Sequence, residues 1–427
     1  MAQNKNSYRT GIFIIGILFF IFGFVTWLNS TLIPYLQIAC ELKHEWQSYL
    51  VTFAFYIAYF VTALPSSWVL RKTGYKNGMM LGLFVMAVGA LLFIPAAMTR
   101  TYGLFLLGLF VMGTGLSVLQ TASNPYVIEL GPPESAAQRV SIMGVCNKGA
   151  GAISPLILGA IFLNDMDTFQ ASLLTMSDVE REAALDALAA KCIVPYVIIM
   201  AALVGLGLFV RFSSLPQIDD PEDETPATAA GKQHRSIFSY PHLWLGIVTL
   251  FFYMGVEVIP VDTIIRYGNE IGLSMDAARV FPTYSMIAFI IGYFVGIICI
   301  PKYISQQRAL AVCAILGAIL TLFVVFTPAD ASIWFLALLS LANSLMWPAI
   351  FPLAIFGLGH HTKTGSALLI MAIAGGAVLP MVFGSLTSSF GYQASYWMLF
   401  PFYLIILYFA VSGHKVGIKH LYEQHKA

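Results

Sequence analysis

The sequence predicts an all-α membrane protein of twelve transmembrane helices, arranged as two pseudo-symmetric six-helix bundles. Of its 427 residues, 59% are hydrophobic and only 10% are charged, and the mean hydropathy is +0.81. Soluble domains carry about 25% charged residues, so most of this surface must face lipid. A bilayer core about 30 Å thick needs about 20 apolar residues per helix, and many runs in the chain reach this length.

The apolar runs set the expected helices, because backbone groups in lipid must be hydrogen-bonded within their own segment. The predicted ranges are 9–38, 47–70, 78–98, 102–129, 139–162, 191–211, 240–268, 280–300, 309–327, 331–357, 363–387 and 392–413. Between the fifth and sixth of them, the run from Ser177 to Glu182 resembles a helix start, which predicts a short exposed helix.

A polar stretch divides the chain into two halves. Residues 213–239 include the acidic run from Asp219 to Glu224 and few apolar groups, as expected for a flexible cytoplasmic linker. The predicted domains are therefore an N-terminal bundle (1–212), this linker, and a C-terminal bundle with a short cytoplasmic tail (240–427).

Lysine and arginine predict the orientation in the membrane. Cytoplasmic termini would place 15 of the 22 basic residues inside and six outside, with Lys148 within a helix. Basic residues favour the cytoplasmic side. The short polar N-terminus, with Lys5 and Arg9, lacks the pattern of a cleaved signal. We therefore expect a multi-pass protein of the cell inner membrane with both termini in the cytoplasm.

The two halves look like copies of each other. Residues match at an offset of about 225 between the fifth and eleventh helices, and of about 232 between the first and seventh. The matching pairs are Ser141 with Ser366, Gly151 with Gly376, Pro155 with Pro380, Gly159 with Gly384, Gly23 with Gly255, Thr31 with Thr263 and Tyr35 with Tyr267. Parallel repeats are a transporter architecture whose binding site lies at the repeat interface near the midplane.

Four segments of the chain carry a resemblance to a known family: the loop 67–76 and the strings Leu28 to Pro34, Leu119 to Tyr126 and Phe252 to Val258. The loop is similar to the loop signature of the major facilitator superfamily, and the three strings are similar to its fucose permease-like branch. The resemblance implies a symporter of a sugar and a cation. Residues 139–151 and 257–263 look most like members that carry glucose, fructose or N-acetylglucosamine.

The chain departs from the fucose permease pattern at two positions. Ser30 and Gln120 stand where that permease has an Asp and a Glu, which the resemblance associates with proton coupling and sugar contact. The repeat offset places Asp262 opposite Ser30, so the ionisable group is expected at the symmetry-related position.

Three ionisable residues inside spans are the coupling candidates: Lys148, Glu257 and Asp262. Such residues usually line a cavity or form pairs. Glu257 and Asp262 point about 140° apart on a regular helix, and Pro260 between them can kink it. We expect Asp262 to face the cavity and to contribute to coupling or sugar binding. Glu257 either takes up protons or stays ionised against Lys148; a fixed ion pair that sets helix packing is the structural alternative.

Amide side chains in the spans are the candidate sugar ligands, because they avoid lipid and suit hydroxyl groups. They are Asn29, Gln120, Asn124, Asn147 and Asn343, with Trp347 and also Trp27 as aromatic platforms, and Tyr56 and Tyr253 as further hydroxyl donors. Hydrogen bonding between helices, and packing for the aromatic residues, is the alternative for each of them.

These observations predict a secondary active transporter that imports a hexose-type sugar (glucose, galactose, fructose, N-acetylglucosamine or fucose) by alternating access. Proton symport is preferred; sodium symport, uncoupled facilitation and drug export are the alternatives. The sequence lacks a phosphate-binding P-loop, a nucleophile elbow and a metal-site motif, so no enzyme, cofactor or metal is expected. Expected partners are the sugar, the coupling cation and membrane lipid but no nucleic acid, with the chain acting as a monomer.

Overall fold

The computed structural model describes residues 2–130, 136–213, 215, 236–300, 302–358 and 361–418. Within these ranges the chain forms helices joined by short loops, and twelve helical segments are long and apolar enough to cross a membrane. The predicted all-α membrane fold is therefore confirmed. Of the predicted linker 213–239, residues 214 and 216–235 lie outside the described residues.

The first half contains nine helices in the described residues: α1 (Ala2–Trp27), α2 (Asn29–Ala39), α3 (Glu45–Ser48), α4 (Leu50–Met98), α5 (Tyr102–Glu129), α6 (Ala136–Phe162), α7 (Met166–Leu173), α8 (Asp178–Ala190) and α9 (Ile193–Phe212). α1 and α2 together make the first span. α4 makes two spans, which meet at Gly74, where φ is 72° and ψ is 170°. Glycine adopts this backbone conformation without the steric penalty of a Cβ atom.

The second half repeats this plan with more interruptions. Its elements are η3 (Ile237–Ser239), α10 (Pro241–Glu270), α11 (Met275–Ala278), α12 (Phe281–Cys299), α13 (Gln306–Phe326), α14 (Ala329–Asn343), α15 (Met346–Ile355), α16 (Thr362–Met371), η5 (Ala372–Ala374), α17 (Gly375–Phe390), α18 (Tyr392–Ser395), η6 (Tyr396–Met398), α19 (Leu399–Val411) and η7 (Gly413–Lys415). Four spans are built from shorter pieces: α11 with α12, α14 with α15, α16 with α17, and α18 with α19.

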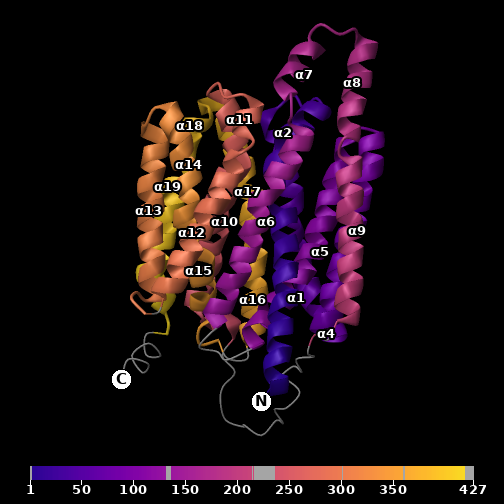
Figure 1. Cartoon of the computed structure of the whole chain (residues 1–427). Coiled ribbons are helices and arrows are strands. Elements are labelled where there is room, and N and C mark those ends of the chain that lie inside the picture. Colours follow the sequence, from indigo (N-terminus) through magenta and orange to yellow (C-terminus); the bar gives the residue numbers. More distant parts are fainter. Residues whose placement is uncertain are drawn as a thin grey trace.

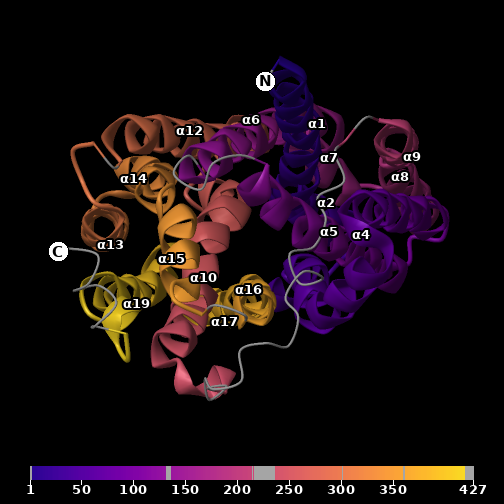
Figure 2. The ribbon, with the colours of Figure 1, turned by 90° about the horizontal axis from the view of Figure 1, so that it is seen from below.

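The two halves stand side by side across the membrane (Figures 1 and 2). We call the end at which α1 begins and α19 ends the lower end, and the end that carries α7 and α8 the upper end, as in Figure 1. The most extensive contacts between helices of the two halves are those of α6 with α12, of α4 with α16 and α17, and of α2 with α10. The boundary between the halves therefore runs through the centre of the molecule.

The exposed helix predicted from the run Ser177 to Glu182 is present as α8. The Ser177 hydroxyl accepts a hydrogen bond from the Glu180 backbone N–H, and the Glu180 carboxylate accepts one from the Ser177 N–H. This capping box satisfies two backbone donors at the start of the helix. α7 and α8 extend above the other helices at the upper end (Figure 1).

Close helix contacts recur in the two halves at glycine positions. A Cβ atom on Gly23 would overlap the carbonyl oxygen of Asn147, and one on Gly375 would overlap that of Phe251. The first contact joins α1 to α6, and the second joins α17 to α10, its counterpart in the second half. Small residues allow such close approach in membranes. The contact at Gly23 fixes the position of Asn147 along α1.

Candidate substrate and coupling site

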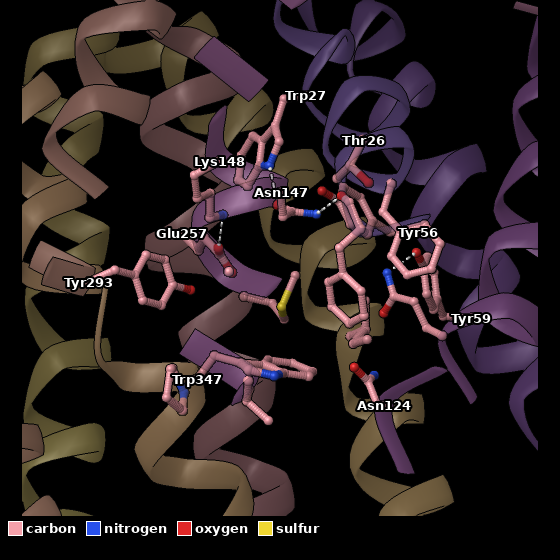
Figure 3. Close-up of a pocket in the computed structure, with 18 residues that line it drawn as sticks. Thr26, Trp27, Tyr56, Tyr59, Asn124, Asn147, Lys148, Glu257, Tyr293 and Trp347 are labelled. Atoms are coloured by element: carbon pink, nitrogen blue, oxygen red, sulfur yellow. Dashed lines mark hydrogen bonds and ion pairs between the residues drawn. The ribbon is translucent and has the colours of Figure 1, made fainter. Parts of the chain in front are cut away.

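A central cavity of about 120 Å³ lies between the two halves. It is lined by Phe19, Phe22, Thr26, Trp27, Tyr56, Tyr59, Gln120, Asn124, Val140, Gly144, Asn147, Lys148, Met254, Glu257, Tyr293, Trp347, Pro348 and Ile373. Asn124 and Val140 lie near the lower ends of α5 and α6, so the cavity extends toward the lower end. Figure 3 shows side chains of both halves pointing into the same space.

An ion pair joins the two halves across the wall of this cavity. Lys148 on α6 donates a hydrogen bond from Nζ to Glu257 Oε1 on α10 at 2.6 Å (Figure 3). Lys148 is 4% exposed and Glu257 is 8% exposed. Two charges removed from water in this way stay stable only while they compensate each other. A change in the charge of either residue must therefore alter the contact between the halves.

Aromatic rings surround the ammonium group of Lys148. Nζ lies 3.8 Å from the centroid of the Trp27 ring and 4.1 Å from that of Phe289. Cation–π contacts of this kind stabilise a cation by about 2 kcal/mol when water is excluded. The rings hold Lys148 at the boundary of the halves, within reach of Glu257.

Three of the predicted amides lie in the cavity wall, all contributed by the first half: Gln120, Asn124 and Asn147. Gln120 donates to the Tyr59 hydroxyl at 3.1 Å, and Asn147 accepts from the Trp27 indole N–H at 3.2 Å (Figure 3). These partners fix the amide groups, while further donor and acceptor positions remain for hydroxyl groups of a ligand.

Trp347 faces these amides from the second half (Figure 3). Its ring centroid lies 6.4 Å from that of Tyr253 and 5.7 Å from that of Phe351. On the opposite wall, Tyr56 and Tyr59 stack with centroids 6.2 Å apart. The cavity thus combines amide groups with two aromatic surfaces, a lining that suits a molecule with both hydroxyl groups and apolar C–H faces.

Asp262 lies outside the cavity, although the sequence predicted it inside. It is 1% exposed and accepts a hydrogen bond from the Thr52 hydroxyl on α4 at 2.8 Å. The angular separation on α10 explains the difference: Glu257 takes the direction of the cavity, and Asp262 is turned toward α4. Only one of the two carboxylates can face the cavity from a regular helix.

Asn29 and Asn343 also lie outside the cavity. Both are fully buried, and the Asn29 amide has no hydrogen-bond partner among the described residues. Asn343 donates to the Val256 carbonyl at 2.6 Å and accepts from the Tyr403 hydroxyl at 2.9 Å. The role of Asn343 visible here is to connect α14, α10 and α19 within the second half.

We predict that Asn343→Leu lowers thermal stability without a selective effect on ligand affinity. The substitution leaves the Tyr403 hydroxyl and the Val256 carbonyl without a partner, and each buried unpaired group costs about 1–3 kcal/mol. Thermal unfolding of the purified protein measures the effect, with Asn124→Leu as the cavity-lining comparison. A change in affinity at unchanged stability would contradict this prediction.

Sequence reasoning missed Tyr59, Tyr293 and Thr26, which line the cavity. Tyr59 follows Tyr56 by three residues, a spacing that places both on one helical face, so this signal was available. Tyr293 is 5% exposed and lies on α12, where its neighbours are apolar and the sequence carries no comparable signal.

The upper end is closed by a group of contacts that we call the upper gate: Ser48, Tyr49, Arg266 and Tyr392. Arg266 donates a hydrogen bond to the Ser48 hydroxyl, and the Tyr49 and Tyr392 hydroxyls lie 2.9 Å apart. The Arg266 guanidinium also lies 5.8 Å from the centroids of both tyrosine rings. Residues of both halves take part, so the gate must break if the halves separate at this end.

Comparison with known proteins connects this geometry to a family. The family model described as Major Facilitator Superfamily matches residues 15–373. A glucose/galactose transporter of Brucella abortus is 35% identical over 417 residues, covering 97% of this chain and 96% of that protein. An L-fucose-proton symporter of Escherichia coli is 32% identical over 396 residues, covering 91% and 90%.

Solved structures agree with this. The structure of FucP, a major facilitator superfamily transporter in the outward conformation, has a TM-score of 0.73 and 30% identity, and the match covers 95% of this chain and 98% of that one. The relatives are transporters rather than enzymes, as the sequence predicted. The expected fold, the repeat architecture and the resemblance stated above are thus confirmed, and the chain belongs to the major facilitator superfamily of multi-pass membrane transporters.

Proposed function

We propose that this protein imports a hexose together with protons across the cell inner membrane. The observation that carries the proposal is the central cavity, where an amide and aromatic lining adjoins a buried ion pair between the halves. The names of the relatives, a glucose/galactose transporter and an L-fucose-proton symporter, support the same substrate class and cation.

Glu257 is the proposed proton carrier and Lys148 its counter-charge. Protonation of Glu257 removes the ionic attraction between α6 and α10 and leaves the Lys148 ammonium group beside a neutral carboxyl group, without a counter-charge. The protonated state therefore favours separation of the halves at this point, and the ionised state favours their contact. A proton and a sugar that both act on this boundary become coupled, because each changes the free energy of the same transition.

Sugar hydroxyls are proposed to bind Gln120, Asn124 and Asn147, with Trp347 against the apolar face of the ring. Ligand cavities in proteins usually measure about 300–1,000 Å³, so a cavity of about 120 Å³ must widen to admit a hexose. Rocking of the two halves about the site supplies this change of volume. Asn29 and Asn343 lie outside the cavity, so they can bind the sugar only if the rocking movement exposes their side chains to it.

We infer that the lower end faces the cytoplasm, because the basic residues gather in its loops and tails. With the upper gate closed and the cavity extending downward, the conformation is then inward-facing. A monomer suffices for this mechanism, because both halves of the site come from one chain. Surrounding lipid contacts the outward-facing apolar side chains.

A transport assay in membrane vesicles tests the function. Radiolabelled glucose, galactose, fructose, N-acetylglucosamine and fucose are supplied with an imposed proton gradient, an imposed sodium gradient or neither. We expect accumulation of at least one hexose with the proton gradient alone. Accumulation that requires sodium would favour the sodium symporter, and equilibration without accumulation would favour the facilitator. Transport of an organic cation in place of all sugars would favour the exporter.

Asp262 is the second coupling candidate, and its hydrogen bond to Thr52 provides a matched control. We expect Asp262→Asn to abolish proton-driven accumulation, because the amide cannot take up a proton. Thr52→Ala removes the same hydrogen bond but keeps the carboxyl group, so it should retain accumulation. Unchanged uphill uptake in Asp262→Asn would show that Asp262 has no part in coupling.

A further inference from the structure

A second cavity lies at the upper end, beyond the gate as seen from the central cavity. Its volume is about 550 Å³, and its lining consists of Pro34, Gln37, Ile38, Leu42, Gln170, Arg266, Asn269, Glu270, Met275, Thr387, Gly391 and Tyr392. These residues come from both halves, on α2, α7, α10, α11, α17 and α18 and the loops beside them. The volume falls within the range of about 300–1,000 Å³ that is usual for ligand cavities.

The lining of this upper cavity provides the groups that a polyhydroxyl ligand needs. Gln37, Gln170 and Asn269 each offer both a donor and an acceptor, Arg266 offers donors, and Glu270 offers acceptors. A small anion would be repelled by Glu270 and a small cation by Arg266, whereas a neutral sugar can use both. A lipid chain would offer no hydrogen bonds to the amide groups of this lining, which is unfavourable.

The Tyr392 ring adds an aromatic surface at one side of the upper cavity. Tyr392 is 5% exposed, and its backbone N–H donates to the Glu270 carboxylate at 3.3 Å. Amides, an aromatic ring and a pair of opposite charges are also the components of the central cavity. The two cavities therefore have similar chemistry at different heights of the same boundary.

Arg266 and Tyr392 belong both to the upper cavity and to the upper gate. A ligand that accepts hydrogen bonds from Arg266 competes with Ser48 for the same guanidinium. Occupation of the upper cavity would then weaken a contact that holds the halves together. Such a ligand is bound at the position from which it enters the central cavity when the gate opens.

We propose that the upper cavity is a second hexose-binding site, at which the sugar docks before the gate opens. The inference rests on the proposed function for the identity of the ligand. It adds a site that the central cavity does not require, because a transporter of this kind can work with a single binding position.

Equilibrium dialysis of the full-length purified protein tests the proposal. The ligand is the radiolabelled hexose that the protein accumulates, or each sugar of the panel in turn if it accumulates none. We expect two bound sugars per chain for the wild type and one for the double variant Gln37→Ala/Asn269→Ala. The matched control is Thr175→Ala, which removes an exposed polar group at the same end outside the cavity and should leave two. Loss of two sugar hydrogen bonds should weaken the outer site at least about tenfold.

The outcomes separate this inference from the proposed function. A wild type that accumulates hexose but binds one per chain would overturn the second site and leave the function intact. Two bound sugars without proton-driven accumulation would support the site and overturn the proton symport. A stoichiometry of two that persists in Gln37→Ala/Asn269→Ala would show that the second sugar lies elsewhere, which also overturns the proposal.

Discussion

Glu257→Gln is expected to abolish proton-driven accumulation, so that the sugar concentration inside vesicles rises only to the external value. The glutamine has nearly the shape of glutamate but cannot take up a proton, so the proposed proton carrier no longer responds to the proton gradient. Exchange of labelled for unlabelled sugar should continue, because it needs the sugar site and the movement of the halves but no net proton transfer. Radiolabelled uptake and exchange in the same vesicles measure both quantities.

The substitution also leaves Lys148 buried without its counter-charge, and breaking a buried ion pair in this way costs about 3–5 kcal/mol. A loss of folded protein would imitate a loss of coupling. The double variant Lys148→Gln/Glu257→Gln removes both charges and should restore the folded protein while leaving it uncoupled. The matched control is Glu182→Gln, which removes a carboxylate that pairs with Arg100 at the upper end and whose side chain is 60% exposed. This variant should accumulate sugar normally. Normal accumulation by folded Glu257→Gln would exclude Glu257 as the proton carrier.

The fold was predictable because its main determinant is a one-dimensional quantity, the length of apolar runs. The predicted range 102–129 coincides with α5, and most other boundaries agree within a few residues. No comparable signal in the sequence indicates the interruption between α1 and α2 at Leu28 or the short helix α3. These details depend on how neighbouring helices pack, which apolar length does not encode.

The site was predictable only in part. The polarity of a side chain predicts that it avoids lipid, but it does not predict whether the side chain lines the cavity or contacts another helix. Gln120 and Asn343 are both amides within spans, yet Gln120 lines the cavity and Asn343 connects helices of one half. The rotation of each helix about its axis decides between these outcomes. That rotation is set by contacts with several other helices, which sequence periodicity around a single span cannot supply.

The repeat offset does not determine which side chains face the cavity. It assigned Asp262 to the cavity by its correspondence with Ser30. Ser30 is itself fully buried, with its hydroxyl donating to the Trp27 carbonyl. Both of these positions lie outside the cavity in this conformation.

α10 makes one contact with α3 and one with α4 that place Asp262 next to the upper gate on the boundary between the halves. Arg266 contacts Ser48, and Asp262 contacts Thr52, with a spacing of four residues on each side. Asp262 and Arg266 share a face of α10 because they are four residues apart, so the two contacts lie one turn of α10 apart along the boundary. Separation of the halves at the upper end must break the Arg266 contact and the Asp262 contact together or in succession.

Arg266→Ala is therefore expected to shift the protein toward a conformation that is open at the upper end. The variant loses a charge-assisted hydrogen bond, which contributes about 1.5–3 kcal/mol, and this changes the ratio of the two conformations by about 10–150-fold. A cysteine at Thr26 in the central cavity, in a background without the five native cysteines, reports the change. A membrane-impermeant thiol reagent added from the α7 and α8 side should label it faster, and sugar import should fall because the gate no longer closes stably.

Arg100→Ala separates gating from a general effect of removing an arginine at this end. Arg100 forms ion pairs with Glu41, Glu182 and Asp186, all within the first half, so its loss leaves the boundary between the halves unchanged. Labelling at the wild-type rate is expected for Arg100→Ala, and equal labelling in the two variants would contradict the gate. If only Arg266→Ala is labelled faster, contacts across the boundary between the halves stabilise the closed upper end. A sugar that binds Arg266 in place of Ser48 would then weaken these contacts and favour opening of the upper gate.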